Sequence, residues 1–325
     1  MIVTYNGAEW VPKCLSSIFS SSIVPEVVVV DNASRDNTIE IVENDFPKAE
    51  LIQLTTNIGF GQANNIGINT GMKLGAEYFF LVNQDTYLMS NCIDELYKSA
   101  RERPEYGILS PVHLSYEGNQ LNPSFANYLT ESSPEVLSDY FLGQPRDFID
   151  MKFVAAAFWF VPRKVFEETG GFDPVYFLYG EDNDLLTRIK NTGWKVGVVT
   201  SARGHHYHAN TSIEKSSNTK DKRQLLNQFL EILKRPDRGL LYGILRFIRR
   251  ALGIFLARTI QRMLLGYGVS GNNSALAAME AICRLSKVRV SRKWIKHRGC
   301  FLSDDYIRAL TEDGANQCSS IIDSV

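Results

Sequence analysis

The chain of 325 residues is 44% hydrophobic and 22% charged, which fits one large α/β domain with an appendage, or two domains, and excludes a disordered chain. Its five cysteines form no CxxC pair, and neither an export signal nor an apolar run of roughly 18 residues is present, which predicts a cytosolic protein without a membrane span. The net charge of −1 hides a division, because residues 1–233 carry 19 basic and 29 acidic residues whereas residues 234–298 carry 15 and 2.

Strands and helices are expected to alternate along the first part of the chain. The patterns predict strands at 2–4, 26–30, 51–54 and 78–82, and helices at 11–19, 38–46 and 62–74. The run Glu26-Val-Val-Val-Val30 is typical of a parallel strand that is buried on both faces. This order predicts an α/β fold with a doubly wound, mostly parallel sheet and right-handed crossovers.

Polar residues follow the last apolar residue of each predicted strand. They are Thr4 to Asn6, Asp31, Asn57 and Asp85. Each alone is ordinary turn chemistry. Ligands of such sheets bind outside the carboxyl ends of the strands, so four polar loops in register predict a ligand crevice at this edge.

The middle of the chain adds further elements. A helix is expected at 92–103, followed by a polar, turn-rich stretch at 113–150 that we interpret as a lid or specificity loop. A buried strand at 153–161, a helix at 163–169 that Gly170 and Gly171 terminate, and a strand at 194–199 complete the pattern. The last strand leads to His205-His206-Tyr207-His208.

Three carboxylates, Glu181, Asp182 and Asp184, stand within four positions at the start of a predicted helix. Acidic residues are common in a first helical turn, where free N–H groups and the helix dipole favour negative charge. A cap needs one acid, however, and three would repel one another without a polar or cationic ligand, which favours an acid/base site.

Seven short motifs occur in order over residues 1–215. They are Val3-Thr-Tyr-Asn-Gly7, Val30-Asp-Asn-Ala-Ser34, Asn57-Ile-Gly-Phe-Gly61 with Asn64, Asn83-Gln-Asp85, Gly170-Gly-Phe-Asp173, Glu181-Asp-Asn-Asp-Leu185 with Arg188, and a histidine before Ser212. Together they resemble the family 2 inverting glycosyltransferases with a GT-A fold, especially the rhamnosyltransferase-like bacterial branch. The resemblance implies a nucleotide-sugar-binding and catalytic domain at 1–215. Beyond it the family pattern fades, and the residues predict a basic helical extension at 216–325.

The resemblance also implies a UDP- or dTDP-sugar donor and a divalent ion. Asp85 is the implied ligand of Mg²⁺ or Mn²⁺, and His206 is the second ligand, with His208 as the alternative. Family members often carry two acids where this chain has Asn83 and Gln84. The opposing interpretation of the histidines is a solvent-facing loop.

The remaining site roles also come from the resemblance. Asp31 would accept a hydrogen bond from N3–H of a pyrimidine base, and the further nucleotide contacts would come from Thr4, Tyr5, Asn6, Asn57 and Asn83. Asp182 resembles the general base, and Glu181 would orient hydroxyl groups. Asp184 and Arg188 are expected to pair across one helical turn. Trp159 is either a sugar-stacking residue or part of the core.

The basic segment contains two predicted helical stretches, 240–267 and 275–296. The first mixes five arginines with apolar residues, which leaves two alternatives. It lies on an anionic membrane as a peripheral anchor, or it packs on the catalytic domain or on a second copy as a homodimer contact. A nucleic-acid partner is not expected because no recognition motif accompanies the charge.

Two other functions compete with sugar transfer. A sugar nucleotidyltransferase would carry a Gly-rich basic loop after the first strand, where this chain has Thr4-Tyr-Asn-Gly7. A weakly active relative would serve as a binding or scaffold subunit of a polysaccharide assembly complex. The family resemblance implies surface polysaccharide synthesis on a glycan or lipid-linked acceptor, in the cytoplasm or at the inner face of the plasma membrane.

Overall fold

The structure is a computed structural model that describes residues 1–207, 213–235, 239–265, 272–295 and 297–307. By its contacts the chain divides into two compact units. Among the described residues, the first unit contains 1–172, 181–207 and 298–307. The second contains 173–180 and the described residues from 213 to 297, so that α9 (Ile213–Lys234) begins beside the boundary expected at residue 215.

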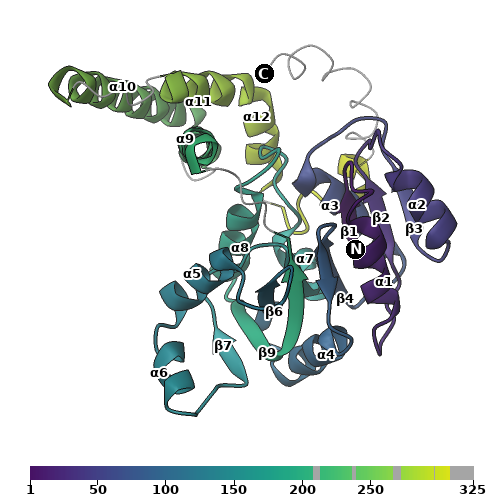
Figure 1. Ribbon diagram of the computed structural model, residues 1–325. Coiled ribbons are helices and arrows are strands. Elements are labelled where there is room, and N and C mark those ends of the chain that lie inside the picture. The colour runs from purple at the N-terminus through teal and green to yellow at the C-terminus, as the bar shows by residue number, and fades with distance from the viewer. Residues whose placement is uncertain (208–212, 236–238, 266–271, 296, 308–325) are drawn as a thin grey trace. The chain divides into compact units, whose positions relative to one another are not determined.

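The first unit is built on a sheet of nine strands among the described residues (Figure 1). Their bounds are β1 (Ile2–Thr4), β2 (Val28–Asp31), β3 (Glu50–Gln53), β4 (Tyr78–Asn83), β5 (Thr86–Leu88), β6 (Tyr106–Ser115), β7 (Phe148–Asp150), β8 (Phe158–Pro162) and β9 (Lys195–His206). The order is β3-β2-β1-β4-β8-β6-β9-β5, with β7 beside β9. The first four strands are parallel, as predicted, and β8 then runs antiparallel to β4 and β6, so the α/β sheet is mixed.

Helices cover both faces of this sheet. They are α1 (Val11–Phe19), α2 (Thr38–Asp45), α3 (Phe60–Lys73), α4 (Cys92–Glu102), α5 (Pro123–Ser132), α6 (Val136–Phe141), α7 (Arg163–Thr169) and α8 (Glu181–Asn191). Val29 packs in a cluster with residues of α1, α2 and α4, whereas Val28 and Val30 pack with Ala63 and Ile66 of α3. Because side chains alternate along a strand, the unbroken valine run of β2 fills the core on both sides.

The stretch at 113–150 is not the loop that the sequence predicted. It contains the end of β6, then α5, α6 and β7. Asn122 caps α5 by accepting hydrogen bonds from the backbone N–H groups of Ser124 and Phe125, and Pro123 occupies the first helical position. Both are standard helix-start signals, which a search for apolar periodicity alone does not detect.

The predicted strand at 153–161 begins later, at Phe158, and its tryptophan belongs to the core. Trp159 is 0% exposed, donates its indole N–H to the Val154 carbonyl at 3.1 Å and stacks on Phe172. A buried ring with a satisfied N–H cannot stack on a sugar. The core alternative for Trp159 is therefore correct.

The second unit is helical. Its helices among the described residues are α9, α10 (Leu240–Leu265), α11 (Asn272–Cys283) and α12 (Leu285–Trp294), so the helical stretch expected at 275–296 contains parts of two helices. Phe229, Leu233 and Phe247 form its core with Val175 and Tyr176. Among the residues that the structure covers, no helix has both the length and the apolar character needed to cross a bilayer.

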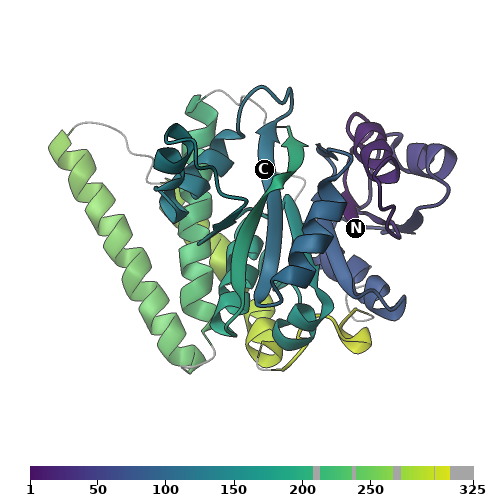
Figure 2. The same cartoon turned by 90° about the horizontal axis from the view of Figure 1, so that it is seen from below.

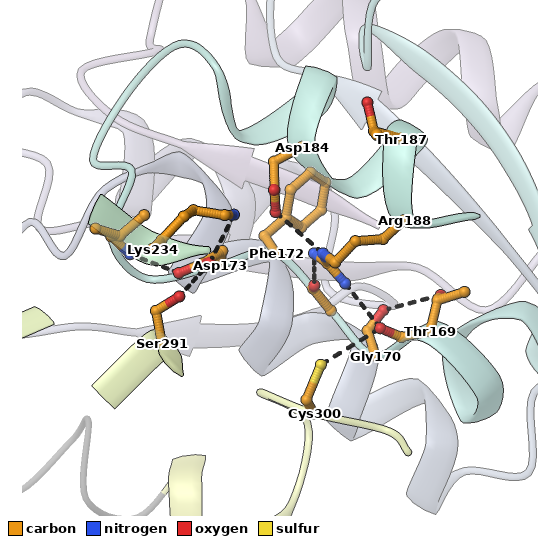
Figure 3. A network of polar contacts seen from close by, with 12 residues as sticks. Thr169, Gly170, Phe172, Asp173, Asp184, Thr187, Arg188, Lys234, Ser291 and Cys300 are labelled. Atoms are coloured by element: carbon orange, nitrogen blue, oxygen red, sulfur yellow. Dashed lines mark hydrogen bonds and ion pairs between the residues drawn. The ribbon is translucent and has the colours of Figure 1, made fainter. Parts of the chain in front are cut away.

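A buried polar cluster fixes the short segment 173–180 in the second unit (Figure 3). The Asp173 carboxylate is 0% exposed and accepts hydrogen bonds from Lys234 Nζ at 2.9 Å and Ser291 Oγ at 2.6 Å. Its other oxygen accepts the backbone N–H of Val175 at 3.0 Å. A buried carboxylate with three donors is a structural junction, because each donor compensates its lost hydration.

Candidate active site

The carboxyl ends of β1 and β2 carry a joined pair of polar side chains. Thr4 and Asp31 are register partners, both 0% exposed, and Thr4 Oγ1 donates to Asp31 Oδ1 at 2.8 Å. Ser34 donates its hydroxyl to Oδ1 at 2.5 Å and its backbone N–H to Oδ2 at 2.8 Å. A carboxylate offers about four acceptor positions, so one position on Oδ2 is left by these three bonds. Because two of these three bonds come from Ser34, the Asp31 carboxylate also stabilises the turn that follows β2.

The loop after β1 is hydrogen-bonded to residues of neighbouring loops. Asn6 has a positive φ of 46° and donates its backbone N–H to Ser34 Oγ at 2.9 Å, while its side-chain oxygen accepts the N–H of Arg35. Gln84 forms a two-way pair with the backbone of Tyr5, at 2.9 and 3.2 Å. The residue Tyr5 is 43% exposed at this edge of the sheet.

Asn57 continues this polar edge. Its side-chain oxygen accepts from Asn32 Nδ2 at 2.9 Å and from the backbone N–H of Gly59 at 3.0 Å. Asn32, next to Asp31, in turn accepts the N–H of Ile58 at 2.9 Å. The loops after β2 and β3 are therefore joined by amide side chains at the point where α3 begins.

The loop after β4 brings Asp85 to His206. Asp85 Oδ1 lies 3.5 Å from His206 Nε2, and β5 pairs with β9 so that Thr86 is the register partner of His206. His205 points to the other face of β9, where it stacks on Tyr87 at 4.1 Å and burial lowers its pKa. Strand alternation thus directs His206 toward the aspartate. His208 lies outside the described residues.

Aromatic rings and one cation surround the Asp85 loop, and the sequence did not single them out. Trp10 lies 4.2 Å from the Tyr207 ring and 5.7 Å from the Tyr116 ring. Lys13 Nζ sits 3.6 Å from the ring centre of Tyr87 and 4.1 Å from that of Tyr116. Trp10 and Lys13 are three residues apart at the start of α1, and this spacing was the sequence signal that the two side chains are neighbours on one helix face.

Asn83 carries a polar atom without a partner beside this loop. Its side-chain oxygen is buried and makes no hydrogen bond, whereas its backbone carbonyl accepts from Thr86 Oγ1 at 2.7 Å. Burying a lone amide oxygen is unfavourable. The unsatisfied oxygen marks a place where a ligand donor would be accommodated.

The three acids of α8 have different surroundings. Asp182 Oδ1 accepts from the backbone N–H of Asn183 at 2.8 Å. Burial raises the pKa of Tyr128 on α5, and the negative charge of Asp182 adds to this rise, which places the tyrosine within electrostatic reach of the carboxylate. Glu181 is buried at the first position of the helix.

Asp184 and Arg188 form the pair that the sequence predicts. Arg188 Nε lies 3.0 Å from Asp184, and its other nitrogens donate to the carbonyls of Thr169 at 2.7 Å and Gly171 at 2.6 Å (Figure 3). The guanidinium thus ties α8 to the end of α7. Because its donors are directed at protein carbonyls, this pair positions α8.

Two sets of contacts connect the region of the α8 acids with the polar sheet edge described above. A Cβ atom on Gly61 would lie 2.8 Å from Phe172 Cβ and 3.5 Å from Glu181 Cβ, so the α3 backbone packs directly on the start of α8. On the other side, His113 stacks on Phe125 of α5, with its ring 6.5 Å from that of His206. Helix α5, which the sequence missed, therefore carries Phe125, which packs on the histidine beside His206, and Tyr128, which is within electrostatic reach of Asp182.

The donor set at Asp85 and His206 fits a divalent ion. Two ligands bound at about 2.1 Å and at right angles lie about 3 Å apart, close to the observed 3.5 Å. Within the described part of the chain, no group of three or more histidine, cysteine, aspartate or glutamate side chains could hold a metal. An ion there would need further oxygen ligands from a substrate or from water, as Mg²⁺ sites commonly do.

Comparisons with known proteins identify the family. The model of "Glycosyl transferase family 2" matches residues 1–170, more than half of the chain. An N-acetylglucosaminyl-diphospho-decaprenol L-rhamnosyltransferase of Mycobacterium tuberculosis is 25% identical over 233 residues, which cover 65% of this chain and 76% of that protein. The dTDP-rhamnosyl transferase RfbF of Shigella flexneri is 24% identical over 216 residues, covering 66% and 70%.

A solved structure supports the fold. The crystal structure of S. aureus TarS 1-349 in complex with UDP superposes with a TM-score of 0.53 at 17% identity, covering 96% of this chain and 89% of that one. At this identity the likeness concerns architecture alone. The chain belongs to glycosyltransferase family 2, and it is a rhamnosyltransferase-like glycosyltransferase with a GT-A fold.

Proposed function

We propose that this glycosyltransferase moves a hexose, rhamnose or a similar sugar, from a UDP- or dTDP-sugar to a hydroxyl group of a glycan or lipid-linked acceptor, with inversion at the anomeric carbon. The observation that carries the proposal is the Asp85–His206 pair, 3.5 Å apart at the carboxyl edge of the parallel strands. Ligands bind at this edge in doubly wound sheets. The rhamnosyltransferase relatives support the choice of sugar.

The donor nucleotide would occupy the edge between β1, β2 and β3. Asp31 has one acceptor position left, which suits the N3–H donor of uracil or thymine, although the side chain is wholly buried in this structure. Tyr5 offers an exposed ring, and Asn6 and Asn57 supply the loop around it. Base binding would therefore require the Asn6 loop to move away from Ser34.

The diphosphate would lie over Asp85. When bound there, Mg²⁺ or Mn²⁺ would neutralise the charge that develops on the leaving nucleoside diphosphate. Asp85 and His206 would hold the ion, and the unsatisfied oxygen of Asn83 would accept a hydrogen bond from the donor or from a bound water. Lys13, held between two tyrosine rings, adds positive charge to the same loop.

Asp182 is the proposed general base. The acceptor oxygen forms a bond to the anomeric carbon while the bond from that carbon to the diphosphate oxygen breaks, and the diphosphate leaves with the electron pair. The acceptor proton passes to the Asp182 carboxylate. Glu181, at the neighbouring position of α8, would orient sugar hydroxyls.

The acceptor would approach over α5 and α6. Leu137, Tyr140 and Phe141 on α6 are 55%, 72% and 83% exposed, an apolar surface that a lipid-linked or glycan acceptor could contact. Synthesis on a lipid-linked acceptor would place the enzyme in the cytoplasm at the inner face of the membrane. The unpaired state of Cys14, Cys92, Cys283 and Cys300, the cysteines within the described ranges, agrees with a reducing compartment.

A donor screen tests the proposal. Thermal shift is measured with UDP-, dTDP- and GDP-sugars, each with Mg²⁺, with Mn²⁺ or with EDTA, and transfer from the best donor is followed on a decaprenyl-diphosphate-linked sugar. We expect a pyrimidine nucleotide to raise the melting temperature most, and only with metal. Preference for GDP-sugars, or binding without any transfer, would contradict the proposal and favour a scaffold role.

A further inference from the structure

We propose that α10 docks the protein on an anionic lipid bilayer through an exposed apolar stripe bordered by arginines. The docking stripe consists of Leu241, Leu245, Ile248, Leu252, Phe255 and Leu256. Figure 2 shows α10 as one long, continuous helix. This inference goes beyond sugar transfer, because the surface lies in the second unit and contains none of the proposed site residues.

The inner face of α10 already accounts for its packing within the second unit. Phe247 is 5% exposed and meets the ring of Phe229 on α9 at 5.1 Å, and Ile244, Ala251 and Ile254 pack on the same cluster. These residues recur every three or four positions, as one helix face does. The helical core of the unit is therefore formed without the docking stripe.

The docking stripe is a second apolar face on the same helix. Its members are 44% to 71% exposed, and they also recur every three or four positions. Leu276, Met279 and Ile282 of α11, in the same unit, are 45%, 63% and 51% exposed. A contiguous run of large exposed apolar side chains on a helix is unusual on a surface that meets only water.

A basic ridge adjoins the stripe, since the hollow that its arginines line also includes Leu245 of the stripe. Arg246, Arg249 and Arg250 line a hollow of about 920 Å³ together with Tyr242 and Gly253. Arg250 reaches Gln228 of α9 at 3.5 Å, so the hollow lies between two helices of the unit. Residues 240–257 contain these three arginines and no acidic residue. Guanidinium groups around a hollow are suited to phosphate oxygens.

The positive charge of the ridge favours an anionic bilayer, rather than a second copy of the chain, as the partner of α10. A second copy would bring the same stretch 240–257, which carries three arginines and no acidic residue, and would therefore offer no charge to neutralise the ridge. Like charges facing each other oppose association, whereas anionic lipid headgroups neutralise the ridge while the stripe enters the acyl boundary. The arginine stems can also lie along the apolar surface and keep their charged ends at the headgroups.

Vesicle co-sedimentation with the full chain tests the proposal. Vesicles that contain phosphatidylglycerol are compared with vesicles of phosphatidylcholine alone, at low and high salt. We expect binding to the anionic vesicles and a loss of binding at high salt, because screening weakens attraction between exposed charges. Equal binding to neutral vesicles, or no binding to either kind, would overturn the proposal.

Matched variants separate the stripe from the ridge. L245S/L252S is expected to lower vesicle binding at least tenfold, and R246Q/R249Q about fivefold for each arginine. The control is Leu74→Ser, since Leu74 is 57% exposed but lies in the first unit, and its vesicle binding should match that of the wild type. All the altered side chains are exposed, so the melting temperatures should stay unchanged.

Two further outcomes would contradict the inference. Light scattering that shows a dimer for the wild type and a monomer for L245S/L252S, without vesicle binding, would assign the stripe to a second copy. Inorganic phosphate that binds the arginine hollow without vesicle binding would assign the hollow to a free anion. Donor binding measured by thermal shift on the same samples keeps a failure of docking distinct from a failure of the proposed sugar transfer.

Discussion

Gly61 is predicted to set the position of the proposed catalytic acids. A methyl group at this position would lie 2.8 Å from Phe172 Cβ, whereas carbon atoms in contact are about 3.5 to 4.0 Å apart. This contact cannot easily relax, since Phe172 is fully buried and both its backbone N–H and its carbonyl are bonded to Asn65 on the same helix α3, at 2.7 and 2.8 Å. The start of α3 would therefore have to move about 1 Å away from Phe172 and Glu181.

The cost of Gly61→Ala follows from two opposing effects. Overpacking a tight contact costs about 1 to 3 kcal/mol, and the better helix propensity of alanine returns at most about 1 kcal/mol. We expect the free energy of unfolding to fall by about 0 to 3 kcal/mol. A displacement of about 1 Å at reacting groups can cost about 100-fold in rate, so kcat/KM should fall far more than stability predicts.

Urea denaturation and initial-rate kinetics on the same preparation test this prediction. The matched control is Gly253→Ala, another helical glycine, where an added methyl group meets nothing within 4 Å. It should stabilise the protein by about 0.5 to 1 kcal/mol and leave transfer to a water-soluble acceptor unchanged. If Gly61→Ala behaves like the control in both assays, α3 does not position the acids, and the reasoning fails.

Three further predictions concern stability, pH and metal. Asp173→Asn removes the carboxylate bonded to Lys234 and should lower the free energy of unfolding by about 3 to 5 kcal/mol in urea denaturation; a loss below about 1 kcal/mol would contradict a buried pair. Burial holds the pKa of His113 well below 6.5 in the folded protein. As the pH falls, the unfolded state therefore takes up a proton at His113 before the folded state does. Stability should be complete above pH 6.5 and fall below it by up to about 1.4 kcal/mol per pH unit, a slope that His113→Gln should reduce in pH-dependent melts. EDTA should abolish transfer and Mn²⁺ restore it in the wild type, whereas Asp85→Asn should need far more Mn²⁺; activity in EDTA would argue against a metal at Asp85.

The parallel half of the sheet could be predicted from the sequence, whereas the rest depended on distant partners. The valine run of β2 is buried on both faces, a local pattern that identifies a parallel strand. The reversal at β8 depends on its pairing with β4, about 80 residues earlier, which no local signal encodes. The long strand β9 likewise gains its last residues from pairing with β5, where Thr86 meets His206.

The candidate site shows the same limit. The order of the seven motifs suggested the family, and the resemblance to that family implied the roles of Asp85, His206 and Asp182. Helix α5 was missed, although Asn122 and Pro123 are a cap and a first-turn proline, because the stretch 113–150 shows little apolar periodicity. Side chains that act across the fold, such as Tyr128 near Asp182, become visible only when tertiary contacts are known.

The turnover number of Asp182→Asn, measured beside the donor dissociation constant, tests the central claim most directly. The account predicts a fall in kcat of about 10²- to 10⁴-fold with donor affinity within about twofold of the wild type, because the amide cannot take the acceptor proton. Glu167→Gln, which removes an exposed carboxylate on α7, should leave both values unchanged. A turnover number for Asp182→Asn near that of the wild type would show that another group accepts the proton.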